Sequence, residues 1–367
     1  MKVLITGANG FIGKNLCVHL RERGIESVSF VRGMTQADLA AKLEGVEFIF
    51  HLAGVNRPKD ESEFIIGNTS LTQSLCELIR ESGRKIPILY TSSIQAEIDN
   101  PYGQSKREAE EALLQLEKAA GIPVYIYRLP NVFGKWSRPN YNSVVATFCH
   151  NIANDLPIHI NFPDAILTLV YIDDVVREFM RLLEDRPLGV VWPEITPQYE
   201  ITVGELAAQI KAFKDSRNSM IIEEVGQGVT RALYSTYLSY LRPAQFTYPL
   251  RSHVDVRGQF VEFLKTKNVG QFSFFTAHSG VTRGGHYHHS KNEKFLVVQG
   301  RAKFKFRHIE TGESYEILTD AATPEVVETV PGWSHDITNI GNGEMIVLLW
   351  ANEIFDPQYP DTITYKV

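Results

Sequence analysis

Two groups of side chains in this sequence have the types and the spacing that chemistry requires. Tyr102 and Lys106 are four residues apart in YGQSK, so they share one face of a predicted helix. A lysine in that position can lower the pKa of the tyrosine and hold a ribose, which leaves the phenol ready to exchange a proton with a carbonyl or an alcohol. Far along the chain, His286 and His288 alternate in the strand-like stretch GGHYHHSKNEK and therefore face the same way, as ligands of one metal ion would.

Three glycines near the N-terminus indicate a third kind of chemistry. Gly7, Gly10 and Gly13 follow the short apolar run VLIT and open a segment with helical spacing. Such a turn lets a pyrophosphate approach the backbone, while free N–H groups at the helix start point at it. We expect a dinucleotide cofactor to bind this turn. The residues expected to contact it are Gly7, Gly10, Phe11, Ile12 and Gly13.

The elements that must position these side chains fall into two patterns. Up to about residue 240, strand-like runs alternate with helical stretches, which predicts an α/β fold with a doubly wound parallel sheet of the Rossmann type. After about residue 244, strand-like runs such as KFKFR (303–307) are separated by glycine-containing turns, which predicts an all-β domain, a sandwich or a barrel. We therefore expect one domain over residues 1–243 and a second over residues 244–367.

Composition narrows the class of protein. The 367 residues are 44% apolar and 22% charged, with a formal net charge of −6, as in a soluble globular protein of two domains. No basic run indicates a nucleic-acid partner, and no apolar segment reaches the ~20 residues that span a membrane. The three cysteines form no CxxC pair and the N-terminus shows no signal peptide, so we expect a cytoplasmic protein.

The glycine spacing, GxxGxxG with the ending FIG, resembles that of the short-chain dehydrogenase/reductase superfamily, in particular its extended branch, which modifies sugar nucleotides. Tyr102 and Lys106 match the YxxxK pair of that family. The resemblance implies that the last residue of TSS, Ser93, hydrogen-bonds the substrate oxygen, with Thr91 and Ser92 as the competing choices. It thus implies a catalytic set of Ser93, Tyr102 and Lys106.

The same resemblance extends to the cofactor. HLAG, with Leu52, Ala53 and Gly54, resembles the family's adenine-side motif, and Asn68 falls where the family has a structural or active-site asparagine. Enzymes that use NAD carry an acidic residue ~20 residues past the glycines, where it binds the ribose 2′-OH. This sequence has Arg32 there, in SFVRG, and an arginine suits a 2′-phosphate. We favour NADP(H), with stacking of the arginine on adenine as the alternative.

Residues 280–300 carry the spacing of the first motif of the cupin superfamily, and PGWSHDITN (331–339) resembles the second. The resemblance implies a site of three histidines and one carboxylate, which suits Zn²⁺, with Fe²⁺, Mn²⁺ and Ni²⁺ as alternatives. His289 is adjacent but points to the other face of the strand, so it is left out. The implied ligands are His286, His288, Glu293 and His335.

Two stretches in the same half, 253–265 and 280–288, resemble segments of the dTDP-sugar 3,5-epimerases, which are cupin-like barrels. Those enzymes remove a proton alpha to a ketone and return it on the other face. Their catalytic histidine corresponds to His286, which the cupin motif makes a metal ligand, so a metal could polarise the ketone instead. The candidates for the base are Tyr287, Lys291, Lys294 and Asp336, and those for gripping the diphosphate are Arg257 and Arg283.

Taken together, the two halves resemble the family of bifunctional capsular polysaccharide synthesis enzymes of the UDP-2-acetamido-2,6-dideoxy-L-talose synthase type, in which an extended reductase is fused to a cupin. The resemblance implies a UDP-linked 4-keto-6-deoxy amino sugar, UDP-2-acetamido-2,6-dideoxy-4-hexulose, as the substrate. It implies C3 epimerisation in the cupin, C4 reduction by NADPH in the reductase, one Zn²⁺ per cupin and a homodimer through the cupin. The product would serve capsule or O-antigen synthesis.

Three alternatives stay open. The first is a reductase with a single activity, whose cupin is a zinc-stabilised dimerisation module. The second is a regulator that binds NADP and a metabolite without turnover; the intact set of Ser93, Tyr102 and Lys106 argues against it, since a sensor needs no proton donor. The third, a 4,6-dehydratase, would carry an acidic pair soon after the catalytic Ser or Thr, for which TSSIQAEID offers no clear match.

Overall fold

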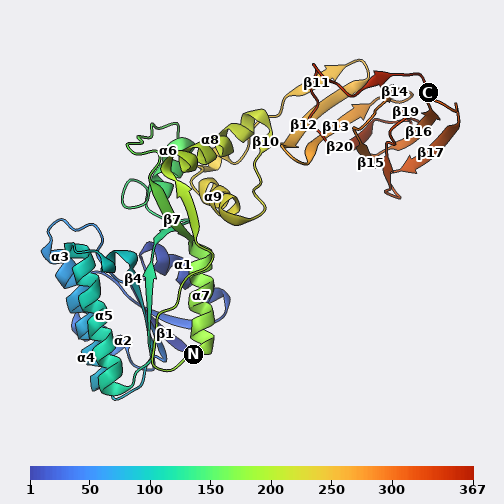
Figure 1. The fold of residues 1–367 in the computed structure, drawn as a ribbon. Helices are drawn as coiled ribbons and strands as arrows, with labels where there is room; N and C mark the ends of the chain where they lie inside the picture. Colours follow the sequence, from blue (N-terminus) through green and yellow to red (C-terminus); the bar gives the residue numbers. More distant parts are fainter. The chain divides into compact units, whose positions relative to one another are not determined.

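The computed structural model describes residues 1–367, and the chain divides into two compact units (Figure 1). Met1–Ile210 and Arg231–Leu241 form the first unit, and Lys211–Thr230 and Arg242–Val367 form the second. None of the helices has the length and the apolar character needed to cross a membrane.

The structure differs from the sequence-based boundary at 243/244 for residues 211–230. Strand β10 (Ile221–Ile222) pairs in parallel with β12 (Gly258–Thr266). Glu223, directly after β10, forms an ion pair with Lys267 at 2.8 Å. Pairing between strands that are far apart in the sequence, such as β10 and β12, leaves no local pattern. The sequence pattern alone therefore placed residues 211–230 in the first domain.

The first unit is built on a parallel sheet of six strands in the order β2-β1-β3-β4-β5-β8 (Figure 1). Every neighbouring pair is parallel, which confirms the predicted doubly wound sheet. The strand order reverses between β1 and β3, and doubly wound sheets bind ligands at the carboxyl ends of the strands at this point. The strands are β1 (Lys2–Thr6), β2 (Glu26–Phe30), β3 (Phe48–His51), β4 (Ile88–Ser93), β5 (Val124–Leu129) and β8 (Val190–Val191).

Helices cover the sheet on both sides, with α4 and α5 on one side and α1 and α7 on the other (Figure 1). On the first side, Leu75 of α4 and Leu113 of α5 share a buried core with Ile49, Ile88 and Ile126 of the strands. The helices are α1 (Phe11–Glu22), α2 (Gln36–Lys42), α3 (Ser62–Phe64), α4 (Leu71–Glu81), α5 (Pro101–Ala120) and α7 (Ile172–Asp185). A π-helical turn (Ile65–Ser70) joins α3 to α4, and a 3₁₀ turn (Ile94–Glu97) follows β4.

Helix α5 begins and ends where its sequence requires. The side chain of Asn100 accepts the N–H of Gly103 at 2.8 Å, and Pro101 occupies the first turn. At the other end, Gly121 takes the left-handed conformation with φ 60°. Both ends are favoured signals for helix termini. This start places Tyr102 in the first turn and Lys106 one turn further on.

A smaller sheet completes the first unit. Strands β6 (Asn131–Phe133) and β7 (Ile166–Tyr171) pair in parallel, and β9 (Tyr199–Thr202) pairs antiparallel with β7. The remaining helices are α6 (Val144–Ala153), α8 (Val203–Ser219), which ends in the second unit, and α9 (Gly228–Leu238); a 3₁₀ turn (Pro243–Gln245) follows.

The second unit consists of two sheets whose strands pair antiparallel except β10 with β12, which confirms the predicted β-rich C-terminal domain. One sheet has the order β10-β12-β13-β20-β15-β18, with β11 beside β12, and the other β17-β16-β19-β14-β21. Phe275 and Phe295 of the first sheet share a core with Phe304 and Ile337 of the second, so the inner faces pack together. The strands after β10 and β12 are β11 (Ser252–Asp255), β13 (Gly270–Ala277), β14 (Thr282–Tyr287), β15 (Glu293–Gln299), β16 (Arg301–His308), β17 (Ser314–Asp320), β18 (Val326–Glu328), β19 (Trp333–Asn339), β20 (Met345–Ala351) and β21 (Ile363–Thr364).

Candidate active site and metal centre

The glycine turn lies between β1 and α1, at the switch point of the parallel sheet. Gly7 has φ +71°, and a Cβ there would lie 2.8 Å from the backbone of Ala53. A Cβ on Gly13 would lie 2.4 Å from the carbonyl oxygen of Gly7. Helix α1 starts at Gly10 without a side-chain cap, so its first N–H groups stay open to a ligand. The turn therefore has the form that binds a pyrophosphate.

A cavity of about 780 Å³ opens beside this turn. It joins the glycine turn to the end of β4, the first turns of α5 and the loop after β6. Most of the cofactor and catalytic residues expected from the sequence line it. They are Gly7, Gly10, Phe11, Ile12, Gly13, Leu52, Gly54, Ser93, Tyr102 and Lys106.

Two expected cofactor residues do not line the cavity. Ala53 lies behind Gly7, where its backbone supports the turn. Arg32 is exposed in the turn that follows β2, at the same edge of the sheet as the end of β1. Its side chain makes no hydrogen bond or ion pair within the described residues 1–367. An arginine so placed can contact only a ligand part that extends beyond the cavity.

The three residues of TSS have different environments. The Ser92 hydroxyl donates to Glu110 Oε1 at 2.5 Å, and the Thr91 hydroxyl lies 3.5 Å from the carbonyl oxygen of His51. Ser93 is half-buried and lines the cavity; its side-chain oxygen accepts the N–H of Gln95 at 3.1 Å, and its hydroxyl also hydrogen-bonds Tyr102. Of the three hydroxyls, that of Ser93 is therefore the one that contacts Tyr102.

Tyr102 and Lys106 both line the cavity, but their electrostatics differ from the expectation. Burial raises the pKa of Tyr102, and the neighbouring Ser93 hydroxyl offsets part of that rise. Lys106 is not among the causes. Its ammonium donates to the carbonyl oxygen of Thr91 at 2.9 Å and lies 4.7 Å from the ring centroid of Tyr90. The expected lowering of the Tyr102 pKa by Lys106 is thus not seen, and the phenol holds its proton at neutral pH.

Lys106 belongs to a buried charge network that the sequence analysis missed. Burial lowers the pKa of Lys106 to about 8, and the charge of Glu110 opposes that change. Glu110 is 3% exposed and also pairs with Arg128, whose Nη2 lies 2.6 Å from Oε2. The available signal was the position of Glu110 one turn after Lys106 on the same helix face.

A buried histidine, His51, with a fixed tautomer connects the end of β1, next to the glycine turn, to α4. Thr72 donates its hydroxyl to the carbonyl oxygen of Asn68 at 2.7 Å, so it accepts the proton of His51 Nε2 at 2.9 Å. His51 Nδ1 then accepts from the Thr6 hydroxyl at 2.7 Å. Burial lowers the pKa of His51 to about 3. Asn68 in turn holds the backbone of Val55, its amide donating to Val55 O at 3.0 Å, which supports a structural role.

In the second unit, the ligand atoms of the four predicted metal ligands lie within 4.8 Å of one another. His286 lies on β14 and His288 in the loop after it, whereas Glu293 begins β15 and His335 lies on β19. The cluster therefore lies between the two sheets. The four residues are His286, His288, Glu293 and His335. Three of them are almost fully buried, with 1%, 6% and 3% exposure for His288, Glu293 and His335.

The donor atoms of this cluster are in the form that a cation requires. His288 Nδ1 lies 2.5 Å from the carbonyl oxygen of Asp361, which can only accept, so Nδ1 carries the proton of the neutral ring. The bare Nε2 then faces Glu293 Oε2 at 3.2 Å. His335 is buried, and neither of its ring nitrogens has a hydrogen-bond partner. Such a convergence of acceptors is costly unless a metal ion satisfies it.

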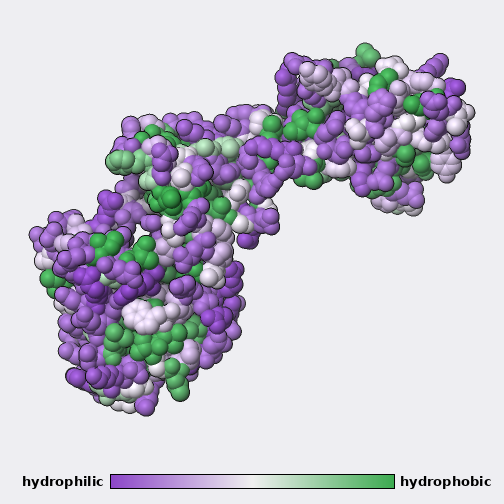
Figure 2. Space-filling view, in the orientation of Figure 1, coloured by the Kyte–Doolittle hydropathy of each residue, from purple (hydrophilic) through white to green (hydrophobic).

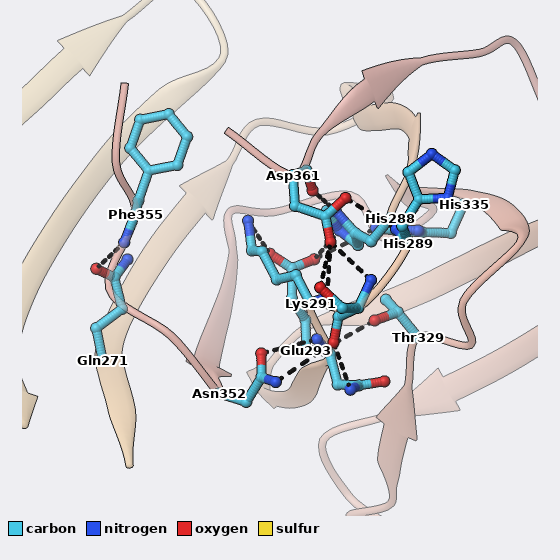
Figure 3. Close-up of polar contacts among 12 residues, drawn as sticks. Gln271, His288, His289, Lys291, Glu293, Thr329, His335, Asn352, Phe355 and Asp361 are labelled. Atoms are coloured by element: carbon cyan, nitrogen blue, oxygen red, sulfur yellow. Dashed lines mark hydrogen bonds and ion pairs between the residues drawn. The ribbon is translucent and has the colours of Figure 1, made fainter. Parts of the chain in front are cut away.

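Lys291 completes the electrostatics of the cluster. Burial alone would raise the pKa of Glu293, but the adjacent His288 and His335 and the Lys291 ammonium hold it far below its ordinary value. Lys291 Nζ lies 3.3 Å from Glu293 Oε1 (Figure 3). Burial and the neighbouring imidazoles lower the pKa of His286 to about 4. The carboxylate is therefore charged and the imidazole neutral at pH 7, as metal ligands must be.

Three of the four candidates for the base lie away from the metal cluster. Tyr287 points to the opposite side of β14, where its ring contacts Tyr365 at 6.1 Å between centroids. Lys294 pairs with Glu328 at 2.7 Å. Asp336 follows His335 on β19 and lies on the opposite face of the strand, away from the cluster. Partial burial there raises its pKa, and the charges of nearby lysines oppose the rise. Strand alternation thus removes these three and leaves Lys291 beside the cluster.

The two candidate diphosphate ligands already have partners. Arg257 forms an ion pair with Asp255 at 2.5 Å. Arg283 donates to the carbonyl oxygen of Thr276 at 3.0 Å and lies 4.9 Å from the ring centroid of Phe275. Burial and then the charge of Arg257 lower the pKa of Arg283, so the two guanidinium groups lie near each other.

Comparison with known proteins defines the class to which this fold and these sites belong. Residues 3–191 match the NAD dependent epimerase/dehydratase family, and residues 253–363 match the polysaccharide biosynthesis C-terminal domain. The chain belongs to the NAD-dependent epimerase/dehydratase family. This confirms the expected reductase-like first domain at the level of that family.

Full-length relatives narrow the comparison. The chain is 62% identical over 368 residues, 100% of its length and 99% of the relative's, to UDP-2-acetamido-2,6-beta-L-arabino-hexul-4-ose reductase of Pseudomonas aeruginosa. It also resembles the crystal structure of the capsular polysaccharide assembling protein CapF from Staphylococcus aureus, with 42% identity, 100% of both chains covered and a TM-score of 0.93. A structure of CapF with the inhibitor 3-isopropenyl-tropolone has a TM-score of 0.87 and 38% identity over 100% of both chains.

Proposed function

We propose that this protein is a bifunctional nucleotide-sugar enzyme of polysaccharide synthesis. It epimerises a UDP-2-acetamido-2,6-dideoxy-4-hexulose at C3 in the second unit and reduces the C4 ketone with NADPH in the first. The product is UDP-2-acetamido-2,6-dideoxy-L-talose. The observation that carries the proposal is the meeting of Ser93, Tyr102 and Lys106 with the glycine turn in one cavity. The relative from Pseudomonas aeruginosa, named as the reductase of a UDP-linked hexul-4-ose, supports the substrate.

In the reduction step, the chain holds the ketone and supplies a proton. The cofactor, bound at the glycine turn, supplies a hydride to C4. The Ser93 hydroxyl, next to Tyr102, hydrogen-bonds the C4 oxygen, and Tyr102 donates its proton to that oxygen as the charge develops. The raised pKa of Tyr102 suits this role, because the phenol keeps its proton at neutral pH until it is needed. Lys106 brings a positive charge to the cavity, where the cofactor ribose would bind, and its pKa of about 8 leaves it mostly protonated at pH 7.

The cofactor preference rests on Arg32. It lies exposed at the edge of the sheet next to β1, beyond the cavity, and has no partner of its own within residues 1–367. A 2′-phosphate on the adenosine ribose would give it one. No acidic residue stands at this place in SFVRG to bind a 2′-OH, so NADP(H) is favoured over NAD(H).

In the epimerisation step, the second unit acts as a zinc-binding cupin. His286, His288, Glu293 and His335 would hold one Zn²⁺, which supplies Lewis-acid polarisation of the C4 ketone and so acidifies the C3 proton. Among the base candidates, Lys291 is the one beside the cluster. Arg257 and Arg283 lie near each other and could receive the diphosphate once Arg257 leaves Asp255.

A second candidate function has an observation in its favour. A reductase with a single activity, whose zinc only stabilises the second unit, fits the deep burial of His288, Glu293 and His335. Four protein ligands that close a site are typical of structural zinc, whereas catalytic zinc keeps an open position. The burial of His286 favours the catalytic role instead: this ligand is only half-buried, which leaves one side of the cluster open to a substrate.

The two functions are separated by proton NMR of the enzyme with a UDP-linked 4-keto-6-deoxy-N-acetylhexosamine in D₂O, with and without NADPH. Deuterium at C3 without cofactor, followed by reduction at C4 after NADPH is added, is expected from the bifunctional enzyme. Reduction without exchange at C3 would leave the single-activity reductase.

A homodimer through the second unit is supported by the outer face of its larger sheet. Phe272, Leu348 and Val298 are 37%, 40% and 44% exposed on neighbouring strands β13, β20 and β15. Phe274 and Trp350 lie on the same face by strand alternation. Hydrophobic side chains reach the surface near β12 and β13 in Figure 2. A second copy of this chain is the partner we propose for this apolar face.

The proposed compartment is the cytoplasm. Cys17, Cys76 and Cys149 are all free, and the last two are buried. A reducing compartment keeps thiols in this state.

A further inference from the structure

The chain after β20 returns to the metal cluster and holds the loop between His288 and Glu293. At the start of this segment, Asn352 accepts the N–H of Asn292 on its side-chain oxygen at 2.9 Å and donates its backbone N–H to the same residue at 3.1 Å. At its end, β21 pairs with β14, and the N–H of Tyr365 donates to Gly285 at 2.9 Å. We call residues 352–365 the C-terminal strap.

The side chain of Asp361, in the strap, binds the loop between His288 and Glu293 (Figure 3). Its carboxylate accepts three successive backbone N–H groups, those of His289, Ser290 and Lys291, at 2.9, 2.7 and 2.8 Å. The Ser290 hydroxyl also donates to it, at 3.1 Å. These bonds hold the pKa of Asp361 well below its ordinary value against the effect of burial. A single charged group therefore sets the backbone of the loop.

The same residue sets the protonation of a metal ligand with its main chain. The carbonyl oxygen of Asp361 accepts the proton of His288 Nδ1 at 2.5 Å, which fixes the ring and turns its bare Nε2 toward the cluster. Bonds of this kind orient metal-binding imidazoles and raise their basicity. One residue thus acts on the ligand through its carbonyl oxygen and on the following loop through its carboxylate.

The conformation of the loop also decides which oxygen of Glu293 faces the imidazoles. Lys291 is 7% exposed, with Nζ 3.3 Å from Glu293 Oε1 and 5.7 Å from the ring centroid of Phe355 in the strap. Phe355 is fixed in turn, because its N–H donates to the side chain of Gln271 at 3.1 Å. Glu293 Oε1 is thereby occupied, and Oε2 is left 3.2 and 3.4 Å from the His288 and His335 rings.

We propose that Asp361 is a positioning residue of the metal centre, which holds His288 and the 289–291 loop in the metal-binding geometry from the C-terminal strap. It is not a ligand, because the bonds of its carboxylate go to the loop backbone and to Ser290. The inference rests on the metal centre proposed above. It predicts that the strap governs how long the protein retains its metal.

The test compares Asp361→Asn with a matched control in the same strap, Asp356→Asn. Asp356 is exposed, and its carboxylate accepts only the N–H of Gln358 at 2.8 Å, so the control makes the same change of charge away from the loop. Full-length proteins are loaded with Zn²⁺, and zinc content and the rate of zinc transfer to an excess of a coloured chelator are measured. We expect D361N to release zinc about 10- to 100-fold faster than wild type, the usual effect of losing an outer partner of a ligand. D356N should match wild type.

Unfolding temperatures with and without zinc separate positioning from general stability. A ligand that binds only the folded state raises the unfolding temperature, so weaker binding in D361N should shrink the rise that zinc produces. An equal loss of stability with and without zinc, together with a wild-type release rate, would overturn the proposal. If the wild-type protein binds no zinc, the proposed metal centre and this inference are both wrong. If wild type and D361N retain zinc equally, only this inference is wrong. Should D361N not fold, Asp361→Glu keeps the charge and should show an intermediate release rate.

Discussion

Glu110 and Arg128 form a bidentate ion pair next to the face of α5 that carries Tyr102 and Lys106, with Nη2 at 2.6 Å from Oε2 and Nε at 3.0 Å from Oε1. The same carboxylate accepts the Ser92 hydroxyl, and its charge opposes the lowering of the Lys106 pKa. The pair therefore connects the end of β4, the lysine and β5. It explains how a lysine that is 5% exposed keeps a pKa near 8.

Replacement of Glu110 by Gln should change the pH dependence of reduction. Without the negative charge, burial lowers the pKa of Lys106 below its present value of about 8. In the proposed reaction Lys106 acts as the ammonium, so activity should be lost as the pH rises through its pKa. The alkaline limb of kcat/KM should move to lower pH by about one unit. The high pKa of Tyr102 keeps its own titration out of this range.

The control for this change is Glu111→Gln. Glu111 is the next residue of α5 and is exposed, so its replacement should leave the pH profile unchanged. An alkaline limb that stays in place in E110Q would show that Glu110 does not set the charge of Lys106.

Two serine variants distinguish the residue that holds the substrate oxygen. Ser93→Ala should lower kcat/KM for reduction by about 10²-fold, the usual cost of losing one donor to a developing oxyanion, while the lost cap on Gln95 costs about 1 kcal/mol of stability. Ser92→Ala removes a buried bond to Glu110 and should lower the free energy of unfolding by about 1–3 kcal/mol, with the smaller effect on kcat. Steady-state kinetics and urea unfolding of both variants test this. The reverse pattern would assign the substrate oxygen to Ser92.

Arg32→Ala should separate the two possible roles of the arginine. If Arg32 binds the 2′-phosphate, KM for NADPH rises about 10-fold, as expected for a lost charge-assisted hydrogen bond, and KM for NADH does not change. The measurement is the reduction rate over a range of each cofactor. Equal increases for both cofactors would instead indicate stacking on adenine, which the two share.

Leu348→Glu should dissociate the proposed homodimer. The side chain lies on the outer face of the larger sheet between Phe274 and Leu296 in the strand register, so a carboxylate there would have to be buried at the interface. Molar mass by light scattering should fall from two chains to one. The control is Leu318→Glu on β17 of the other sheet, which is 63% exposed. A dimer that survives L348E would place the contact on another surface.

The sequence by itself determined the chemistry that depends on local spacing. A glycine turn after a strand, a tyrosine and a lysine one helical turn apart, and two histidines on alternate strand positions are fixed by neighbours in the chain. The structure brings these groups to one cavity and one cluster, as expected. The alternation of strands and helices likewise predicted the parallel sheet, because its period is local.

Only the tertiary structure decided what lies behind those residues. Arg128 reaches Glu110 because β5 pairs with β4, and Asp361 reaches His288 because β21 pairs with β14. The outward direction of Asp336 and the placement of residues 211–230 in the second unit also follow from strand pairing between distant segments. Periodicity reports which side of an element is buried and not which distant segment buries it. The residues that hold the reactive groups in place were therefore out of reach of the sequence, while the reactive groups themselves were within it.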